Sequence, residues 1–308
     1  MNPRRIILPG GAGFIGQHLA RHLADLDYDI TILTRTPRPD APRIRHLRWD
    51  GQTPDPWTAA LDGAHAVINL AGRSVNCRYT AKHKQEIYDS RLLPTKLLGD
   101  AIDACKSPPP VWFNASSATI YRDASDDRAM DETTGEIGHD FSMDVCKKWE
   151  AALDAAPTPH TRKVALRAAM VFGPGKGGVF AAFHLLTRLG LAGTLGHGRQ
   201  WMSWIHVQDF CRAVQFLLDR PDLAGPVNLT APSPVRNREF MQTFRDAAHR
   251  SIGLPATKWM LEIGAFFLRT ETELLLKSRR VLPTRLSSAG FTFDFPDLKP
   301  ALDDLESQ

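Results

Sequence analysis

Three glycines that follow a short apolar run constrain this fold more than any other feature of the sequence. The run from Arg4 to Leu8 leads directly into Gly10, Gly13 and Gly16, and a helical pattern of leucines then continues to Leu26. A chain leaving a buried strand here must turn sharply, let its backbone approach a pyrophosphate and start a helix whose N-terminus faces the negative charge. A plain glycine-rich turn is the alternative, but the strand before and the helix after favour a dinucleotide-binding loop. The residues expected at the cofactor are Gly10, Gly13, Phe14, Ile15 and Gly16.

The end of the next apolar run, Asp29 to Leu33, indicates which dinucleotide is preferred. It is followed by Thr34 and Arg35, whereas an NAD-preferring site usually carries an Asp or Glu there for the ribose 2′-hydroxyl. An arginine instead accommodates a 2′-phosphate, because a planar guanidinium can bind it with two parallel hydrogen bonds. We therefore expect Thr34 and Arg35 to contact the cofactor, with Arg38 in support, and NADP(H) to be preferred over NAD(H). A solvated loop arginine is the alternative.

Strand-like and helix-like segments alternate along the first two thirds of the chain. This alternation predicts an α/β fold with a doubly wound parallel sheet of the Rossmann type and a smaller, mostly helical C-terminal region on the substrate side. We expect a dinucleotide-binding domain over residues 1–172, with its sheet completed by about 203–231. The substrate-side region would then comprise residues 173–202 and 232–308.

Composition excludes several classes of function. The net charge of the 308-residue chain is only +4 and its basic residues are scattered, so no nucleic-acid partner is implied. The most apolar late segment, Trp259 to Leu276, contains four charged residues and does not resemble a membrane span. The cysteines show neither paired nor metal-ligand spacing, which favours free thiols, a cytoplasmic location and no metal site. They are Cys77, Cys105, Cys146 and Cys211. The sequence leaves open whether the protein is a monomer or a homodimer.

Four later segments carry a family resemblance. They are Asn69–Gly72, Asn114–Tyr121, Leu166–Pro174 and Trp204–Asp209. Together they resemble the extended and atypical short-chain dehydrogenase/reductases. The run Ser278–Leu286, followed by Ala289-Gly-Phe, is similar to the YfcH-type epimerase family proteins with their C-terminal extension. The resemblance implies further cofactor contacts at Leu70, Ala71, Gly72, Glu86, Arg91 and Met170.

The catalytic pair common in that superfamily is missing from this sequence. A tyrosine followed four residues later by a lysine usually moves the substrate proton, because the lysine lowers the pKa of the phenol. None of the four tyrosines here has a lysine at that spacing. Alignment of Glu150 with the glutamate common at the end of this helix puts Ser142 at the tyrosine position and Cys146 at the lysine position.

Other residues are candidates to replace the pair. Ser117 lies where the family has its catalytic Ser or Thr, and Tyr121 could donate a proton from the pocket wall, although a bonded hydroxyl and a packed ring are the alternatives. The expected substrate-side residues are Arg199, Trp201, Trp204 and His206. For His206 a buried histidine with a structural role is the alternative.

Two functions remain open at this point. The first is an NADP(H)-dependent epimerase, reductase or dehydratase-like oxidoreductase acting on a small polar substrate, with a nucleotide-sugar as one candidate. The second is a non-catalytic NADPH sensor or partner-binding module that kept the cofactor site. The missing pair favours the second function, and the complete substrate-side region favours the first.

Overall fold

The computed structural model describes residues 4–54, 56–124, 126–175, 177–255 and 277–308. The apolar segment from Trp259 to Leu276, which we expect not to cross a membrane, lies outside the described residues. Among the helices within these ranges, none is both long and apolar enough to span a bilayer.

A parallel sheet forms the centre of the molecule. Seven strands of the described chain pair in the order β10-β6-β5-β4-β1-β2-β3. Their bounds are β1 Arg5–Pro9, β2 Asp29–Thr34, β3 Ile44–Arg48, β4 Ala66–Asn69, β5 Val111–Ser117, β6 Arg162–Ala168 and β10 Gly225–Leu229. The chain builds outward from β1 to β3 and then crosses back to β4 on the other side of β1. Such a reversal opens a crevice at the carboxyl ends of β1 and β4, where ligands bind in sheets of this kind. The expected Rossmann-type sheet is confirmed.

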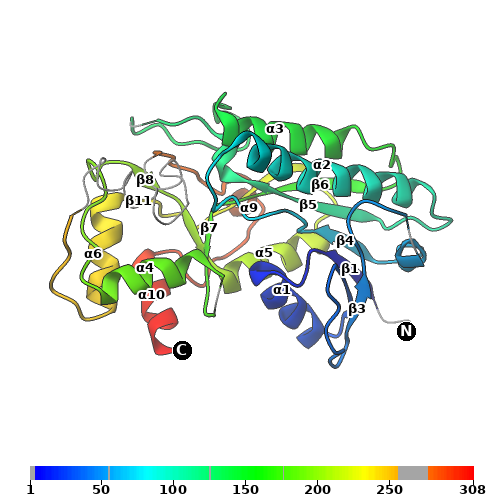
Figure 1. Ribbon diagram of the computed structural model, residues 1–308, viewed down its shortest axis with the longest axis horizontal. Coiled ribbons are helices and arrows are strands. Elements are labelled where there is room, and N and C mark those ends of the chain that lie inside the picture. Colours follow the sequence, from blue (N-terminus) through cyan, green and yellow to red (C-terminus); the bar gives the residue numbers. More distant parts are fainter. Residues whose placement is uncertain (1–3, 55, 125, 176, 256–276) are drawn as a thin grey trace.

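Helices cover both faces of the sheet (Figure 1). On one face lie α1 (Phe14–Asp25) and α5 (Val207–Leu218), and on the other lie α2 (Ala81–Asp103) and α3 (Phe141–Asp154). Alternate residues of each strand point to opposite faces, so Ile6 packs toward α1 while Ile7 packs toward α2. Two short 3₁₀ turns, η1 (Pro56–Ala60) and η2 (Ala118–Ile120), precede β4 and follow β5.

A smaller lobe lies beyond the carboxyl ends of the central strands (Figure 1). Its elements are β7 Met170–Phe172, α4 Val179–Arg188, β8 Trp201–Met202, β9 Trp204–His206, β11 Val235–Arg236, α6 Asn237–Ala247 and α10 Leu298–Ser307. The short helix α9 (Thr284–Ser288) instead packs beside β10, with Leu286 in the core of the main sheet. β7 pairs with β9 in parallel, and β8 pairs with β11 in antiparallel orientation. The core of this lobe is aromatic, with Phe172, Phe240 and Phe244 almost fully buried between α4, α6 and α10. The lobe therefore lies next to the carboxyl ends of the strands, on the side where the glycine loop is.

Candidate functional site

The three glycines of the β1–α1 loop meet different demands. Gly10 has a φ of +74°, and a Cβ atom there would lie 2.7 Å from the backbone nitrogen of Ala71. A Cβ atom at Gly16 would lie 2.5 Å from the backbone of Gly11. Gly13, by contrast, has an ordinary φ of −76°, and its Cβ atom would meet only the Gly10 carbonyl, at 3.5 Å. The fold therefore requires Gly10 and Gly16, whereas Gly13 leaves space open at the N-terminus of α1.

That open space has the properties of a pyrophosphate cradle. Gly13 is exposed and is the N-cap residue of α1, which starts at Phe14. The first N–H groups of a helix have no partner within it, and the helix dipole makes this end attractive to anions. A dinucleotide fits the residues present, because the backbone at Gly13 can be approached without a side chain in the way.

The turn after β4 forms the other wall of the crevice. Asn69 is fully buried, and its side-chain oxygen accepts a hydrogen bond from the backbone N–H of Ala71 at 3.0 Å. Its amide nitrogen donates to Asn114 at 2.7 Å, the residue paired with it on β5. This bridge holds Leu70 and Ala71 against Gly10. Sequence reasoning did not assign Asn69 a role, although the asparagines near the ends of both strands were a signal.

The carboxyl end of β2 carries arginines and no carboxylate. Arg35 is exposed and makes no hydrogen bond or ion pair within the described part of the chain. Arg38 reaches back to the glycine loop and donates to the carbonyl of Ala12 at 3.4 Å. Thr34 ends the strand, and its hydroxyl accepts from the N–H of Thr36 at 3.4 Å. The guanidinium of Arg35 is therefore available for a ligand beside the loop.

The two α2 residues implied by the resemblance already have protein partners. Glu86 forms an ion pair with Arg73. Arg91 donates to the carbonyls of Ile87 and Arg73, both at 3.1 Å. Burial lowers the pKa of Arg91, and its guanidinium carbon lies 3.4 Å from where a Cβ atom of Gly72 would be. Arg91 therefore supports the turn after β4 from behind and places a buried cation at the crevice.

Ser117 lies at the end of β5, where a short chain of polar atoms leads to α3. Its hydroxyl donates to the carbonyl of Ala168 at 3.4 Å and accepts from both the N–H and the hydroxyl of Thr119, at 3.2 and 3.0 Å. The Thr119 hydroxyl also contacts the Cys146 thiol at 3.4 Å. Burial raises the pKa of Cys146, so this thiol stays protonated. The geometry brings Ser117 and Cys146 into one cluster through Thr119, a residue that sequence reasoning missed.

Tyr121 does not fit the expected role as a proton donor from the pocket wall. The residue is fully buried, and its hydroxyl donates to Asn228 and accepts from Arg167, both at 2.9 Å. Arg167 also forms an ion pair with Glu150 at 2.7 Å. Burial raises the pKa of Tyr121, which keeps the phenol neutral. Tyr121 is thus part of a closed network between β6, α3 and β10, without an atom free for a substrate.

Two of the four expected substrate-side residues are core residues instead. Trp204 is fully buried, and its ring is stacked on Phe172 with a centroid separation of 6.1 Å. His206 is 2% exposed, caps α5 by accepting from the N–H of Gln208 and packs on Phe295 at 4.1 Å. Its Nε2 atom lies 3.3 Å from a carboxylate oxygen of Asp304. Both side chains hold the smaller lobe together, which corrects the expectation that they face a substrate.

The other two expected substrate-side residues, Arg199 and Trp201, lie nearer to the surface. Arg199 is exposed, and its carbonyl accepts a hydrogen bond from Arg236. Trp201 is half-buried, with the guanidinium carbons of Arg236 and Arg280 at 4.0 and 5.0 Å from its ring centroid.

Met170 begins β7 and is half-buried at the edge of the aromatic core. Among the described residues, no group of three or more His, Cys, Asp or Glu side chains could hold a metal ion.

A glycine loop that opens a helix at the switch point of a parallel sheet defines a dinucleotide-binding protein of the Rossmann type. The chain belongs to the NAD dependent epimerase/dehydratase family, whose model matches residues 6–229. A second model, a domain of unknown function named DUF1731, matches residues 256–305. The resemblance to extended short-chain dehydrogenase/reductases with a C-terminal extension is therefore confirmed.

Known proteins of similar sequence cover almost the whole chain. The epimerase family protein SERP0438 of Staphylococcus epidermidis is 33% identical over 98% of this chain and 99% of its own length. The crystal structure of human epimerase family protein SDR39U1, solved with NADPH, is 32% identical with a TM-score of 0.87, covering 98% of this chain and 99% of that one. A nucleoside-diphosphate sugar epimerase from Corynebacterium glutamicum is 26% identical with a TM-score of 0.78, covering 99% of this chain and 58% of that one.

Proposed function

We propose that the protein binds NADP(H) in preference to NAD(H). The open space at Gly13, which the fold does not require and a pyrophosphate would fill, supports the binding of a dinucleotide, and the observation that carries the preference is the arginine at the end of β2. Arg35, unpartnered in the described chain and beside that loop, would bind the 2′-phosphate, with Arg38 next to it. The NADPH in the structure of human SDR39U1 supports the same choice.

We further propose that the protein is an oxidoreductase of the epimerase, reductase or dehydratase type. The bound cofactor would supply hydride transfer, and the chain would hold the reactants and move the proton. Ser117 is the proposed proton-handling residue, because its hydroxyl lies at the end of β5 and its long bond to the Ala168 carbonyl can be exchanged for one to a substrate oxygen. The two bonds that it accepts from Thr119 would keep the oxygen oriented during that exchange.

The proposed substrate is a small polar molecule, with a nucleotide-sugar as the first candidate. The relative from C. glutamicum is described as a nucleoside-diphosphate sugar epimerase, which supports this class. Arg199 and Trp201 remain the substrate-side candidates, since a cation and a half-buried aromatic ring suit a phosphate and a base or sugar. The four cysteines are all free thiols, which supports a reducing compartment such as the cytoplasm.

A second candidate function is a non-catalytic NADPH sensor or partner-binding module. The observation that favours it is the state of α3, where a buried, protonated Cys146 stands at the proposed lysine position. With Tyr121 enclosed by its network, Ser117 is left as the main candidate for proton transfer. A sensor would keep the cradle and need no proton donor.

NADPH fluorescence separates the two functions. The protein is incubated with NADPH and a panel of carbonyl compounds and nucleotide-sugars, and oxidation is followed together with product analysis for epimerisation. The enzymatic function is supported if a compound is turned over and Ser117→Ala lowers this turnover about 10²- to 10⁴-fold while the NADPH affinity is unchanged. Tyr121→Phe is the matched hydroxyl variant and should lower stability rather than turnover. Tight NADPH binding without turnover of any compound would make the sensor the better conclusion.

A further inference from the structure

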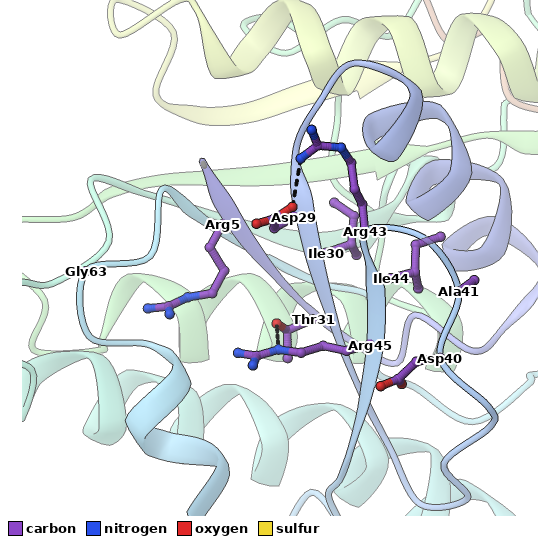
Figure 2. A pocket seen from close by; sticks show the side chains of 10 residues that line it. All are labelled: Arg5, Asp29, Ile30, Thr31, Asp40, Ala41, Arg43, Ile44, Arg45 and Gly63. Carbon is purple, nitrogen blue, oxygen red and sulfur yellow. Dashed lines mark hydrogen bonds and ion pairs between the residues drawn. The ribbon is translucent and has the colours of Figure 1, made fainter. Parts of the chain in front are cut away.

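A polar cavity lies at the end of the sheet opposite the cofactor cradle. It has a volume of about 600 Å³, within the range of small-molecule sites, and opens beside the amino ends of β1, β2 and β3 (Figure 2). Its lining includes Arg5 at the start of β1, whereas the glycine loop follows the end of that strand. Five strand residues span about 17 Å, so this cavity is separate from the dinucleotide site.

Strand register brings three polar side chains onto one face at this cavity. Thr31 of β2 is paired with Ile7 of β1 and with Arg45 of β3. Arg5 lies two residues before Ile7, and side chains two apart along a strand share a face. Arg5, Thr31 and Arg45 therefore line the same side of three adjacent strands. Figure 2 shows the two arginine side chains extending to the same side, toward the segment that carries Gly63.

The carboxylates around the cavity are already engaged by other groups. Arg43 pairs with Asp29 at 2.9 Å and with Asp27 at 3.0 Å. Asp40 accepts from the backbone N–H of His46 at 2.8 Å. The nearby Asp62 carboxylate accepts from the N–H of Ser107 at 2.7 Å. None of these carboxylates forms an ion pair with Arg5 or Arg45.

Each of those arginines uses only part of its donor capacity. Arg5 donates through Nη2 to the carbonyl of Asp62 at 2.6 Å, and Arg45 donates through Nε to the Thr31 hydroxyl at 2.8 Å. Neither forms an ion pair with a described residue, although a guanidinium carries five N–H donors. Thr31 is 1% exposed, and its hydroxyl proton has no acceptor among the described residues. Two guanidinium groups on one face, each with free N–H donors and neither in an ion pair, are suited to share one anion.

We propose that this cavity is a second binding site, for a small molecule that carries an oligophosphate. Phosphate oxygens accept bidentate hydrogen bonds from planar guanidinium groups, and a diphosphate is long enough to be shared by two of them. No described residue that lines the cavity is aromatic, so the phosphates rather than a base carry the recognition. Arg5 and Arg45 hold the phosphates, and Thr31 orients the Arg45 guanidinium by accepting from its Nε.

Isothermal titration with inorganic pyrophosphate tests the proposal on the NADPH-saturated protein. We expect saturable binding of pyrophosphate that weakens at high salt. Arg5→Gln and Arg45→Gln should each weaken this binding about tenfold or more. Arg21→Gln removes an exposed arginine from α1 and is the matched control, with unchanged affinity expected. Two independent variants keep the test valid should one of them fail to fold.

Two further arms identify what the cavity recognises. Gly13→Val blocks the glycine loop, and pyrophosphate binding should persist in this background because the cavity at the amino ends of the strands is unchanged. ATP should bind about as well as pyrophosphate if the phosphates alone are recognised. The proposal is overturned if pyrophosphate does not bind the saturated protein, if the Gly13→Val background abolishes binding, or if sulfate binds as tightly as pyrophosphate. An equal loss in Arg21→Gln would also contradict it.

Discussion

At Gly13 the fold would accept a side chain, whereas the proposed dinucleotide would not. We expect Gly13→Val to bind NADPH far more weakly while its free energy of unfolding changes by less than about 1 kcal/mol, because the new side chain fills space that the protein itself does not use. Fluorescence titration and urea unfolding measure the two effects. Gly16→Val is the contrasting variant and should fail to fold, since its Cβ atom would meet the backbone of Gly11 at 2.5 Å. Unchanged NADPH affinity in Gly13→Val would mean that the phosphates bind elsewhere.

Arg35 carries the proposed choice between the two dinucleotides. A charge-assisted, two-pronged contact contributes about 1.5–3 kcal/mol, so Arg35→Asp should weaken NADPH binding about ten- to a hundredfold and leave NADH binding equal or stronger. Parallel titrations with both dinucleotides measure the ratio of dissociation constants. Arg21→Asp, on the exposed face of α1, controls for the same change in net charge away from the loop. Equal dissociation constants in the unmodified protein would contradict the assignment.

The surroundings of helix α3 explain why the usual tyrosine–lysine pair cannot simply be restored by substitution. Cys146 faces an apolar cluster with Ala118, Met130 and Val281. Two guanidinium groups lie close enough to favour the thiolate electrostatically, those of Arg91 and Arg279, and burial still raises the pKa of the thiol. An ammonium group at this position would lose its hydration and lie near two like charges.

Cys146→Lys should therefore destabilise the protein rather than activate it. We expect its free energy of unfolding to fall at least about 2 kcal/mol further than that of Cys146→Ala, which removes only the thiol. Urea unfolding of the two variants measures the difference. A Ser142→Tyr, Cys146→Lys double variant that folds normally and gains dehydrogenase activity would show that the pocket still accepts the usual pair.

Long elements could be predicted from the sequence, and contacts between distant elements could not. The apolar runs Arg4–Leu8 and Asp29–Leu33 and the helical pattern to Leu26 predict β1, β2 and α1 to within a few residues. β8 and β11 have two residues each, which is too short for any periodicity. The loop at Gly10 follows from local backbone demands, so it too could be read directly.

The roles of single side chains depend on partners far away in the chain. Tyr121 is enclosed by Arg167 and Asn228, which are 46 and 107 positions further on. Trp204 and His206 lie two apart on β9 and so share a face, and only the packing of the aromatic core and α10 makes that face an inner one. Local patterns contain no information about such contacts, which is why the sequence predicts the glycine loop but not the burial of these side chains.

At the scale of the whole molecule, His206 links α5 to the C-terminal helix and makes stability depend on pH. Burial lowers its pKa from the ordinary value of 6.5, despite Asp304 nearby. Below pH 6.5 the unfolded chain therefore binds a proton that the folded protein resists, and stability falls as the pH decreases toward the folded-state pKa. Above pH 6.5 both states are neutral at this group and the effect disappears.

His206→Asn should flatten this dependence, because asparagine can still cap α5 but does not titrate. Urea midpoints between pH 7.5 and 5 measure the slope, to which one group contributes at most about 1.4 kcal/mol per pH unit. Some slope should remain, since burial also lowers the pKa of His65. His160→Asn changes an exposed histidine and is the control. An identical pH profile in His206→Asn would refute this role of the histidine.

The freedom at Gly13 also has an evolutionary consequence. Selection for a foldable chain alone would retain Gly10 and Gly16, whose missing side chains make room for neighbouring backbone, and would be indifferent to Gly13. A lineage that abandoned the dinucleotide would therefore be free to drift first at this position, with the sheet and its helices intact. Retention of glycine at position 13 is then expected only while a dinucleotide is bound there. A larger residue at this position in a descendant would indicate that dinucleotide binding had been lost.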